Sequence, residues 1–383
     1  MPKSPYVSRT VAGMTASVYS GLAQRLATYK GETYPFHIGD TWMDPPPGCH
    51  MEDLRTEEYE GLHRYAPVQG LPLLRSAIVE RVSRLSGEAI EDAQVLITAG
   101  ATGGLGAVLG ALLEPGYEVL ILAPYWPLIE GIVRSFHGTP IAVPAMAAHD
   151  RPQDMVHMLQ EALTERTVAV YWNTPNNPTG AVLGETCLRM LSEWARANEL
   201  WILADEVYED YAYEDSHVPS RPFAPERTFA SFSFSKAFGM SGNRVGYVVG
   251  PAEAMQHVRK VSTHTYYSVP TASQVAAVRV LQGPGDAWAS AARARYMEVG
   301  RAAAKRLGVA PPGGSTFLFL DVADWLDERG LTGLLEDLVQ EGLLVAPGPS
   351  FGPFPTHVRC CYTATEPERT LRGIEILAKR LGR

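Results

Sequence analysis

Short runs of apolar residues alternate with helix-like segments through the middle of the chain. The apolar runs are residues 95–97, 119–123, 141–143, 168–172, 201–204, 228–232 and 245–249. The segments with helical spacing between them are 103–113, 128–136, 155–163, 185–197 and 252–261. Strands that are apolar throughout are buried on both faces, and strands that alternate with helices form parallel sheets. The pattern therefore predicts an α/β fold whose seven-stranded, mostly parallel sheet has helices on both faces.

The two ends of the chain follow a different pattern. Pro45, Pro46 and Pro47 exclude a helix and favour an extended connector. Helices are predicted over 17–28, 71–85, 286–307, 332–341 and 366–381, and strands within 313–322, 343–345 and 357–361. We expect three parts: an N-terminal segment (1–44) that joins the smaller domain, a large domain with the ligand site (45–280), and a small C-terminal α+β domain (281–383).

The composition excludes several kinds of partner. The formal net charge of −9 gives a polyanion no general attraction, so we expect no nucleic-acid partner. No uncharged apolar run approaches the roughly 18 residues of a membrane span, and the first residues lack the apolar stretch of a signal peptide. The cysteines, Cys49, Cys187, Cys360 and Cys361, lack metal-ligand spacing and are typical of buried thiols in a reducing compartment. We therefore expect a cytoplasmic protein without a bound metal.

Lys236 is the candidate around which the chemistry is organised. It lies in TFASFSFSKAFGMSGNRVGY, residues 228–247, and is the only lysine between Lys30 and Lys260. An amine among small and apolar residues loses hydration, so its pKa falls and it becomes a better nucleophile. A chance survivor in an arginine-rich chain would look the same, so the neighbouring motifs must decide between the two.

Two of the predicted strands end in residues that suit a phosphate or a flat ring. Gly100, Ala101 and Thr102 form a small-residue turn before an apolar helix, where backbone amides and the helix N-terminus favour an anion. Such turns also occur where a helix only packs closely on a strand. Tyr125 and Trp126 follow the second run, where an aromatic side chain either stacks on a ligand ring or covers the core.

Polar residues also follow the fourth and fifth runs. Asn177 lies in NTPNNPTG, where Asn177–Pro178 is a candidate cis bond that presents the asparagine amide to a ligand. Asp205 follows a buried strand directly, so its carboxylate needs a partner, and a pyridinium N–H is one such partner. Tyr208 lies three residues later and can turn its hydroxyl to the same place, although both residues could instead cap the next loop.

The remaining candidates suit anions. Ser233, Ser235 and Arg244 flank Lys236 and together suit a phosphate dianion. Arg359 lies inside the apolar run HVRCC, and a buried arginine needs an anion, from a ligand or from a structural ion pair.

In this order the residues resemble the class I/II aminotransferases, pyridoxal 5′-phosphate enzymes of fold type I. SFSFSKAFGMSGNRVGY is similar to the cofactor-lysine signature of that family, and NNPTG and DEVY are similar to two further motifs. The resemblance extends from about residue 35 to 380.

The resemblance implies a role for each candidate. Lys236 is implied to form the internal aldimine with pyridoxal phosphate and to carry protons during catalysis. The residues implied to hold the ring are Asp205 at the pyridine nitrogen, Tyr208 and Asn177 at the phenolic oxygen, and Trp126 on the ring face. Those implied to hold the phosphate are Gly100, Ala101, Thr102, Ser233, Ser235, Arg244 and, from the neighbouring subunit of a homodimer, Tyr65. Those implied to bind the substrate carboxylate are Arg359, Asn177 and the backbone of Gly39.

The implied reaction moves an amino group from an L-amino acid to a 2-oxo acid through pyridoxamine phosphate. No second arginine for a distal carboxylate is evident, which argues against a dedicated aspartate enzyme. Trp42, Tyr266 and Tyr267 favour a bulky neutral or aromatic side chain on the donor, whereas Asp40 and Asp44 leave a basic donor open.

Two alternatives remain open at this point. A pyridoxal-phosphate-dependent β-lyase, or an elimination and cyclisation enzyme like capreomycidine synthase, would keep Lys236, Asp205 and Arg359, and would release ammonia or pyruvate without an acceptor. The aminotransferase-like module of certain transcription regulators is not catalytic, but it follows an N-terminal DNA-binding domain, for which we expect no room before residue 35.

Overall fold

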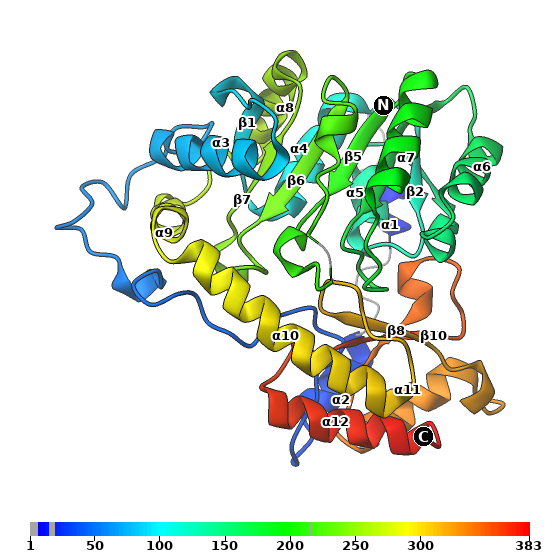
Figure 1. The fold of residues 1–383 in the computed structure, drawn as a ribbon. Coiled ribbons are helices and arrows are strands. Elements are labelled where there is room, and N and C mark those ends of the chain that lie inside the picture. Colours follow the sequence, from blue (N-terminus) through cyan, green and yellow to red (C-terminus); the bar gives the residue numbers. More distant parts are fainter. Residues whose placement is uncertain (1–6, 15–19, 215) are drawn as a thin grey trace, which may run out of the picture.

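The computed structural model describes residues 7–14, 20–214 and 216–383. Its larger part holds a seven-stranded sheet of order β1-β7-β6-β5-β4-β2-β3 (Figure 1). The strands are β1 (Val95–Thr98), β2 (Glu118–Leu122), β3 (Thr139–Val143), β4 (Thr167–Asn173), β5 (Trp201–Asp205), β6 (Thr228–Ser233) and β7 (Gly246–Val249). Only β7 runs antiparallel to its neighbours, and the other pairs are parallel. The predicted fold class is confirmed.

Helices cover both faces of this sheet because successive strand residues point to opposite sides. In β1, Val95 and Ile97 enter one apolar core and Leu96 enters the other. The helices on the first side are α3 (Pro72–Ser86), α6 (Pro152–Ala162), α7 (Glu185–Ala197) and α9 (Thr271–Gln282). Those on the second side are α4 (Gly100–Leu112), α5 (Leu128–Ser135) and α8 (Ala252–Thr265).

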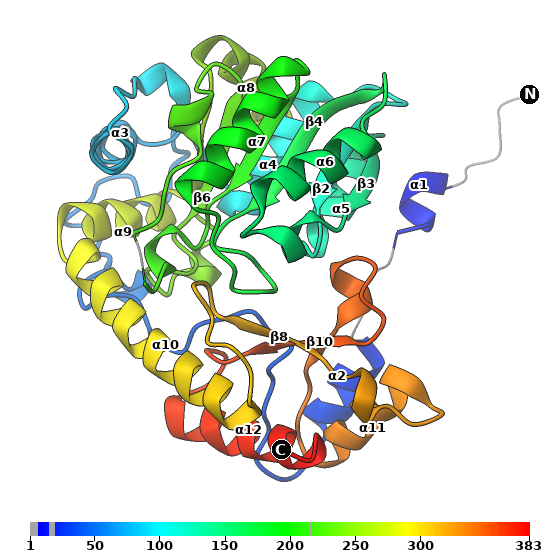
Figure 2. The same cartoon turned by 45° about the vertical axis from the view of Figure 1, so that its right-hand side comes forward.

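The smaller part lies beside the carboxyl ends of the large sheet (Figures 1 and 2). Its antiparallel sheet has the order β8-β10-β9, formed by β8 (Phe317–Asp321), β9 (Ala346–Pro347) and β10 (His357–Cys361). The helices of this part are α2 (Ser20–Ala27), α11 (Gly330–Gln340) and α12 (Pro367–Arg380), and a short helix, α1 (Arg9–Ala12), packs on α5 of the larger part. The long helix α10 (Gly285–Leu307) connects the two parts, and Trp288 near its start packs against both cores. The domain limits at residues 45 and 281 stay a prediction.

Some elements differ from the sequence-based prediction, and one lies partly outside the described residues. The run 343–345 is not a strand of the small sheet, because its backbone instead pairs with the N-terminal segment: Leu344 accepts from His37 N at 2.8 Å and donates to Tyr34 O at 3.1 Å. Helix α9 was not predicted, because it is buried on several sides and carries no clear polar face. The helix predicted over 17–28 lies partly outside the described residues, and its described part begins at Ser20.

Other sequence-based expectations can be compared with the described residues. The four cysteines are buried and unbridged. No described helix has the length and apolar character needed to cross a membrane. No group of three or more His, Cys, Asp or Glu side chains in the described part is arranged to hold a metal ion.

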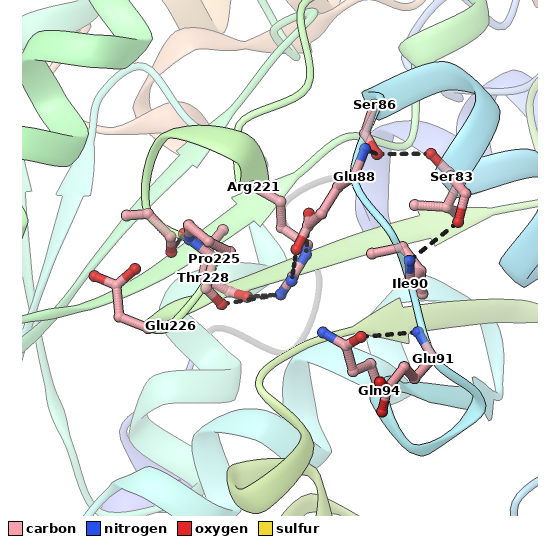
Figure 3. Close-up of polar contacts among 12 residues, drawn as sticks. Ser83, Ser86, Glu88, Ile90, Glu91, Gln94, Arg221, Pro225, Glu226 and Thr228 are labelled. Carbon is pink, nitrogen blue, oxygen red and sulfur yellow. Dashed lines mark hydrogen bonds and ion pairs between the residues drawn. The ribbon is translucent and has the colours of Figure 1, made fainter.

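A buried ion pair anchors the start of β6, the strand that leads to Lys236. Figure 3 shows Arg221 between Glu88 and the carbonyl groups of Pro225 and Thr228. The guanidinium donates to both carboxylate oxygens of Glu88, and the Arg221 side chain is only 3% exposed. The pair joins the turn after α3 to the segment before β6, so the two segments hold each other in place.

We expect Arg221→Met to destabilise the protein strongly. It leaves Glu88 and two carbonyl groups without their cation in a buried place, which costs about 3–5 kcal/mol of unfolding free energy. Urea unfolding measures this change. The matched control is Arg151→Met, which removes an exposed i,i+3 pair with Asp154 and costs at most about 0.5 kcal/mol. Equal unfolding free energies for the two variants would contradict the anchoring role.

Candidate active site

A cavity of about 720 Å³ opens at the carboxyl ends of the large sheet and extends to the small part. Ligands of open α/β sheets bind at this edge. The predicted site residues that line the cavity are Gly39, Ala101, Thr102, Trp126, Asn177, Asp205, Tyr208, Ser233, Ser235, Lys236, Arg244 and Arg359. Residues from both ends of the chain and from four strands are thus brought together. Two predicted residues, Gly100 and Tyr65, are not part of the lining.

The turn after β4 is held by its own asparagines. Asn173 Oδ1 accepts from the backbone N–H of Asn177 at 2.6 Å, and its Nδ2 donates to the backbone oxygen of Asp205 at 2.7 Å. Asn176 Oδ1 accepts from the N–H and the hydroxyl of Thr179. The Asn177–Pro178 peptide bond is cis, which confirms the prediction. The turn therefore positions Asn177 beside the end of β5.

Asp205 is a buried carboxylate with one free oxygen. Its Oδ2 accepts from the Tyr171 hydroxyl at 2.7 Å, whereas its Oδ1 has no hydrogen-bond partner among the residues that the structure describes. Burial raises the pKa of Asp205 to about 6, although the Tyr171 hydrogen bond opposes the rise. A buried, unsatisfied carboxylate oxygen is costly, so this geometry calls for a donor from a ligand.

Lys236 is half-buried in the same cavity. Its Nζ donates to the backbone oxygen of Gly39, and its own backbone oxygen accepts from the Tyr211 hydroxyl at 2.7 Å. Burial lowers the pKa of the Lys236 ammonium, while the carboxylate of Asp40 opposes this effect. A lysine with a lowered pKa has a larger fraction of free amine, which suits a nucleophile and a proton acceptor.

Arg359 is a buried guanidinium without an acidic partner. It is 4% exposed, and it forms no ion pair within the described ranges of the chain. Nη1 donates to Asn177 Oδ1 at 3.0 Å and Nη2 donates to the backbone oxygen of His37 at 2.6 Å. Its carbon Cζ lies 4.3 Å from the ring centre of Phe317 and 5.0 Å from that of Phe351. The positive charge is thus fixed in place and remains available to an anion.

Arg244 and two serines form a second cationic corner. Ser233 Oγ donates to Ser235 Oγ at 2.8 Å, and Arg244 Nη1 donates to the backbone oxygen of Ser241 at 2.8 Å. Gly100 has a φ of +66°, and a Cβ at this position would lie 2.4 Å from Arg244 Nη2. Gly100 therefore lets the guanidinium approach the N-terminus of α4 rather than lining the cavity itself. The corner combines hydroxyls, a guanidinium and helix amides, as a phosphate site requires.

Some aromatic residues that were named from the sequence do not line the cavity of a single chain. Tyr65 is 86% exposed and packs edge-on against Tyr267, so within one chain it does not reach the cavity. Trp42 packs against Tyr296, and neither Tyr266 nor Tyr267 lines the cavity. Their side-chain directions depend on tertiary packing, which the sequence pattern does not show.

Sequence reasoning also missed residues that the structure places in or beside the site. Tyr171 holds Asp205, and Glu130 and Ser350 line the cavity. Tyr171 lies inside an apolar strand, and its position two residues before Asn173 was the available signal, because alternate strand residues share a face. Glu130 was hidden as an ordinary acid in the first turn of α5.

Comparison with known proteins identifies the family. The pattern of the family described as aminotransferase class I and II matches residues 40–377. This chain belongs to that family. It is therefore an aminotransferase that depends on pyridoxal phosphate and acts on amino acids and oxo acids.

Relatives and solved structures agree with this assignment. The probable aspartate/prephenate aminotransferase of Thermus aquaticus is 33% identical over 329 residues, which cover 84% of this chain and 85% of the relative. The arginine–pyruvate transaminase of Pseudomonas aeruginosa is 34% identical over 325 residues, which cover 82% of this chain and 81% of the relative. The structure of Thermus thermophilus aspartate aminotransferase with maleate matches with a TM-score of 0.88 at 29% identity, covering 98% of this chain and 100% of that chain.

The residues of this aminotransferase fit its cofactor. The free Oδ1 of Asp205 suits a pyridine N–H, and the corner of Ser233, Ser235 and Arg244 suits a phosphate. Lys236 lines the same cavity and supplies the amine that an aldehyde needs.

Proposed function

We propose that this aminotransferase moves an amino group from an L-amino acid with a bulky neutral or aromatic side chain to a 2-oxo acid, with Lys236 as the proton carrier. The supporting observation is that the amine of Lys236, the free carboxylate oxygen of Asp205 and the unpaired guanidinium of Arg359 share one cavity. The donor, its carboxylate and the cofactor ring can therefore meet in one place.

The charged residues hold the two reactants. Arg359, with Asn177 and the backbone of Gly39, binds the substrate carboxylate and fixes the direction of its Cα–H bond. The phosphate is held by Ser233, Ser235, Arg244 and the amides of Ala101 and Thr102. Trp126 would hold the ring of the cofactor, and the Asn177 amide and the Tyr208 hydroxyl would donate to its phenolic oxygen. Tyr208 is only 3% exposed, so its hydroxyl is kept from bulk water.

When bound, pyridoxal phosphate supplies an aldehyde that condenses with amines and a cationic ring that accepts electron density from the Cα–H bond. Asp205 keeps the proton on the ring nitrogen, because its buried carboxylate needs that positive partner. Lys236, once its amine is free, would take the Cα proton as a base and give it back as an acid. The fall in the lysine pKa caused by burial favours the first of these steps.

The cavity argues against acidic donors. Among the described residues, the arginines that line it are Arg244 and Arg359, and in this proposal they bind the phosphate and the α-carboxylate. Glu130, which accepts a hydrogen bond from Tyr125, adds a negative charge to the wall that would repel a second carboxylate. Leu105, Trp126 and Leu128 supply apolar lining, although Trp42, Tyr266 and Tyr267 do not contribute to it. The printed names of the relatives cover both aspartate and arginine, so the donor must be measured.

The half-reaction tests this proposal. Holoenzyme is mixed with a single amino acid and no oxo acid, and the loss of visible absorption, the oxo acid formed and the ammonia released are recorded. We expect one oxo acid per subunit, no ammonia, and faster reaction with phenylalanine or tryptophan than with aspartate. Aspartate as the best donor would overturn the donor assignment. Repeated turnover with ammonia or pyruvate release would show instead that the chain is a lyase or an elimination and cyclisation enzyme.

We expect Arg359→Lys to weaken use of every donor. Lysine keeps the charge but loses the planar fork, so kcat/KM should fall by about 10- to 100-fold through weaker carboxylate binding. The control is Arg372→Lys on α12, which changes an exposed ion pair with Glu32. Unchanged kcat/KM in the Arg359 variant would place the substrate carboxylate elsewhere.

We also propose a homodimer in which Tyr65 reaches the phosphate site of the partner. Tyr65 and Tyr267 form an exposed aromatic pair whose ring centres are 5.2 Å apart, and tyrosines are enriched at protein interfaces. Sedimentation equilibrium of active enzyme should give the mass of two chains. A fully active monomer would contradict the shared site.

A further inference from the structure

We propose that Arg81 is a positioning residue that holds the backbone of Lys236 through the loop after Tyr208. The inference rests on the proposed function, because it concerns how the cofactor lysine is held. It assigns to α3, which contributes nothing to the cavity lining, a part in the geometry of the active site.

The guanidinium of Arg81 is buried among three carboxylates. The side chain is 5% exposed, Nη2 lies 3.2 Å from Glu209 Oε1 and 2.8 Å from Asp210 Oδ1, and Nη1 lies 2.9 Å from Asp286 Oδ1. Nη2 also lies 2.9 Å from Asp210 Oδ2, so this nitrogen contacts both oxygens of that carboxylate. A planar guanidinium with several fixed acceptors permits little rotation, unlike a lysine ammonium.

The acids held by Arg81 belong to the loop that contacts Lys236. Glu209 and Asp210 form a short 3-10 helix, η4 (Glu209–Tyr211), directly after Tyr208. The hydroxyl of Tyr211 donates to the backbone oxygen of Lys236 at 2.7 Å, and Tyr211 is 1% exposed. The chain of contacts therefore runs from α3 through η4 to the backbone of Lys236. It includes Glu209, which directly follows Tyr208, the proposed donor to the phenolic oxygen.

Arg81 also contacts the lysine loop from its other side. Its Cζ lies 5.7 Å from the ring centre of Phe238, which is two residues after Lys236. The guanidinium of Arg81 thus contacts both the η4 loop and the loop that carries Lys236. A displacement of Arg81 would act on Lys236 from two directions.

Arg81 is the ion-pair partner of Glu209 and Asp210 among the described residues. Burial raises the pKa of Glu209 to about 7, while the charge of Arg81 and also that of His217 oppose the rise. Without the guanidinium, the carboxylates of Glu209 and Asp210 would lose their hydrogen-bond donor and turn toward water, because buried charges need a partner. This change moves η4, and with it the tyrosines on both sides of the acids. Asp286 is 63% exposed and is shared with Arg84, so it belongs to the outer edge of the network.

The alternative is a purely structural role, in which Arg81 only stabilises the fold. Three variants separate the two: Arg81→Met removes the charge and keeps the stem, Asp210→Asn weakens the same link and leaves Arg81 in place, and Arg84→Met is the matched control. Arg84 is 54% exposed and bonds Asp286 only. Each holoenzyme is assayed for kcat, for KM and for the pH midpoint of the visible absorption of the cofactor on Lys236. Thermal unfolding shows that each variant is folded at the assay temperature.

We expect kcat to fall by about 10- to 100-fold in the Arg81 and Asp210 variants, as for a displacement of the order of an ångström, with KM changed less than about threefold. The midpoint of the visible absorption should move by about half a pH value or more in both variants. Arg84→Met should match the wild type in all three readouts.

The Asp210 variant keeps the test decisive if Arg81→Met fails to fold. Folded variants of Arg81 or Asp210 whose kcat and absorption midpoint equal those of Arg84→Met would overturn the proposal, since a role confined to stability moves neither readout. Lys236→Ala separates this outcome from failure of the proposed function. If that variant kept the visible absorption, the cofactor would not be bound at Lys236, whatever Arg81 does.

Discussion

Replacement of Lys236 by alanine should lower kcat by about 10⁴-fold or more and abolish the visible absorption that the lysine–cofactor bond produces. Among the residues that the structure describes, Lys236 is the one lysine in the cavity lining, and burial lowers the pKa of its amine. The variant loses both the covalent attachment and the group that carries the proton. Stopped-flow absorbance and steady-state turnover measure the two losses separately.

The matched control is Lys260→Ala, because Lys260 is an exposed lysine on α8. It should keep its activity and its spectrum. The Lys236 variant should still bind pyridoxal phosphate noncovalently, since Arg244 and the serines remain, and added methylamine should restore part of the proton transfer. Full activity of Lys236→Ala would refute the proposed mechanism.

Replacement of Asp205 by asparagine should lower kcat by about 10²- to 10³-fold, because the ring nitrogen loses its anionic partner. In the cofactor-free protein, the same change should increase stability relative to the wild type as the pH rises. The folded pKa of about 6 lies above the ordinary 3.8, so between these values the folded protein holds a proton that the unfolded chain has released. Raising the pH through this window therefore costs the wild type stability.

This loss amounts to about 2 kcal/mol of unfolding free energy between pH 4 and pH 7, and the asparagine variant does not undergo it. Urea unfolding of both cofactor-free proteins should show the variant gaining on the wild type by about this amount over the window. The gain should shrink in the holoenzyme, where the pyridinium pairs with the wild-type carboxylate. Parallel pH profiles for the two cofactor-free proteins would contradict the buried, unsatisfied state of Asp205.

Local sequence patterns were sufficient to predict much of the site. Asp205, Ser233 and the turn of Asn177 each follow an apolar run, and the carboxyl ends of parallel strands meet at one edge. Their approach to one another therefore follows from strand order, without knowledge of any side-chain contact. Lys236 could be singled out because the sequence has no other lysine between Lys30 and Lys260.

Contacts between distant segments could not be predicted in this way. Arg81 and Asp210 are 129 residues apart, and no periodicity links a buried arginine on α3 to a loop after β5. Trp42 and Tyr267 were expected near the donor, but the direction of an aromatic side chain depends on which surface it packs against. The run 343–345 was read as a strand of the small sheet because the sequence does not show that residues 34–37 are its backbone partner.

The most direct test of the account is to map the cofactor on the chain. Holoenzyme is reduced with borohydride, which makes the lysine–cofactor bond permanent, then digested, and the peptides are sequenced by mass spectrometry. We predict a phosphopyridoxyl group on Lys236 in the peptide that contains SFSK. A group on any other lysine, or complete retention of cofactor with Lys236 unmodified, would contradict the account.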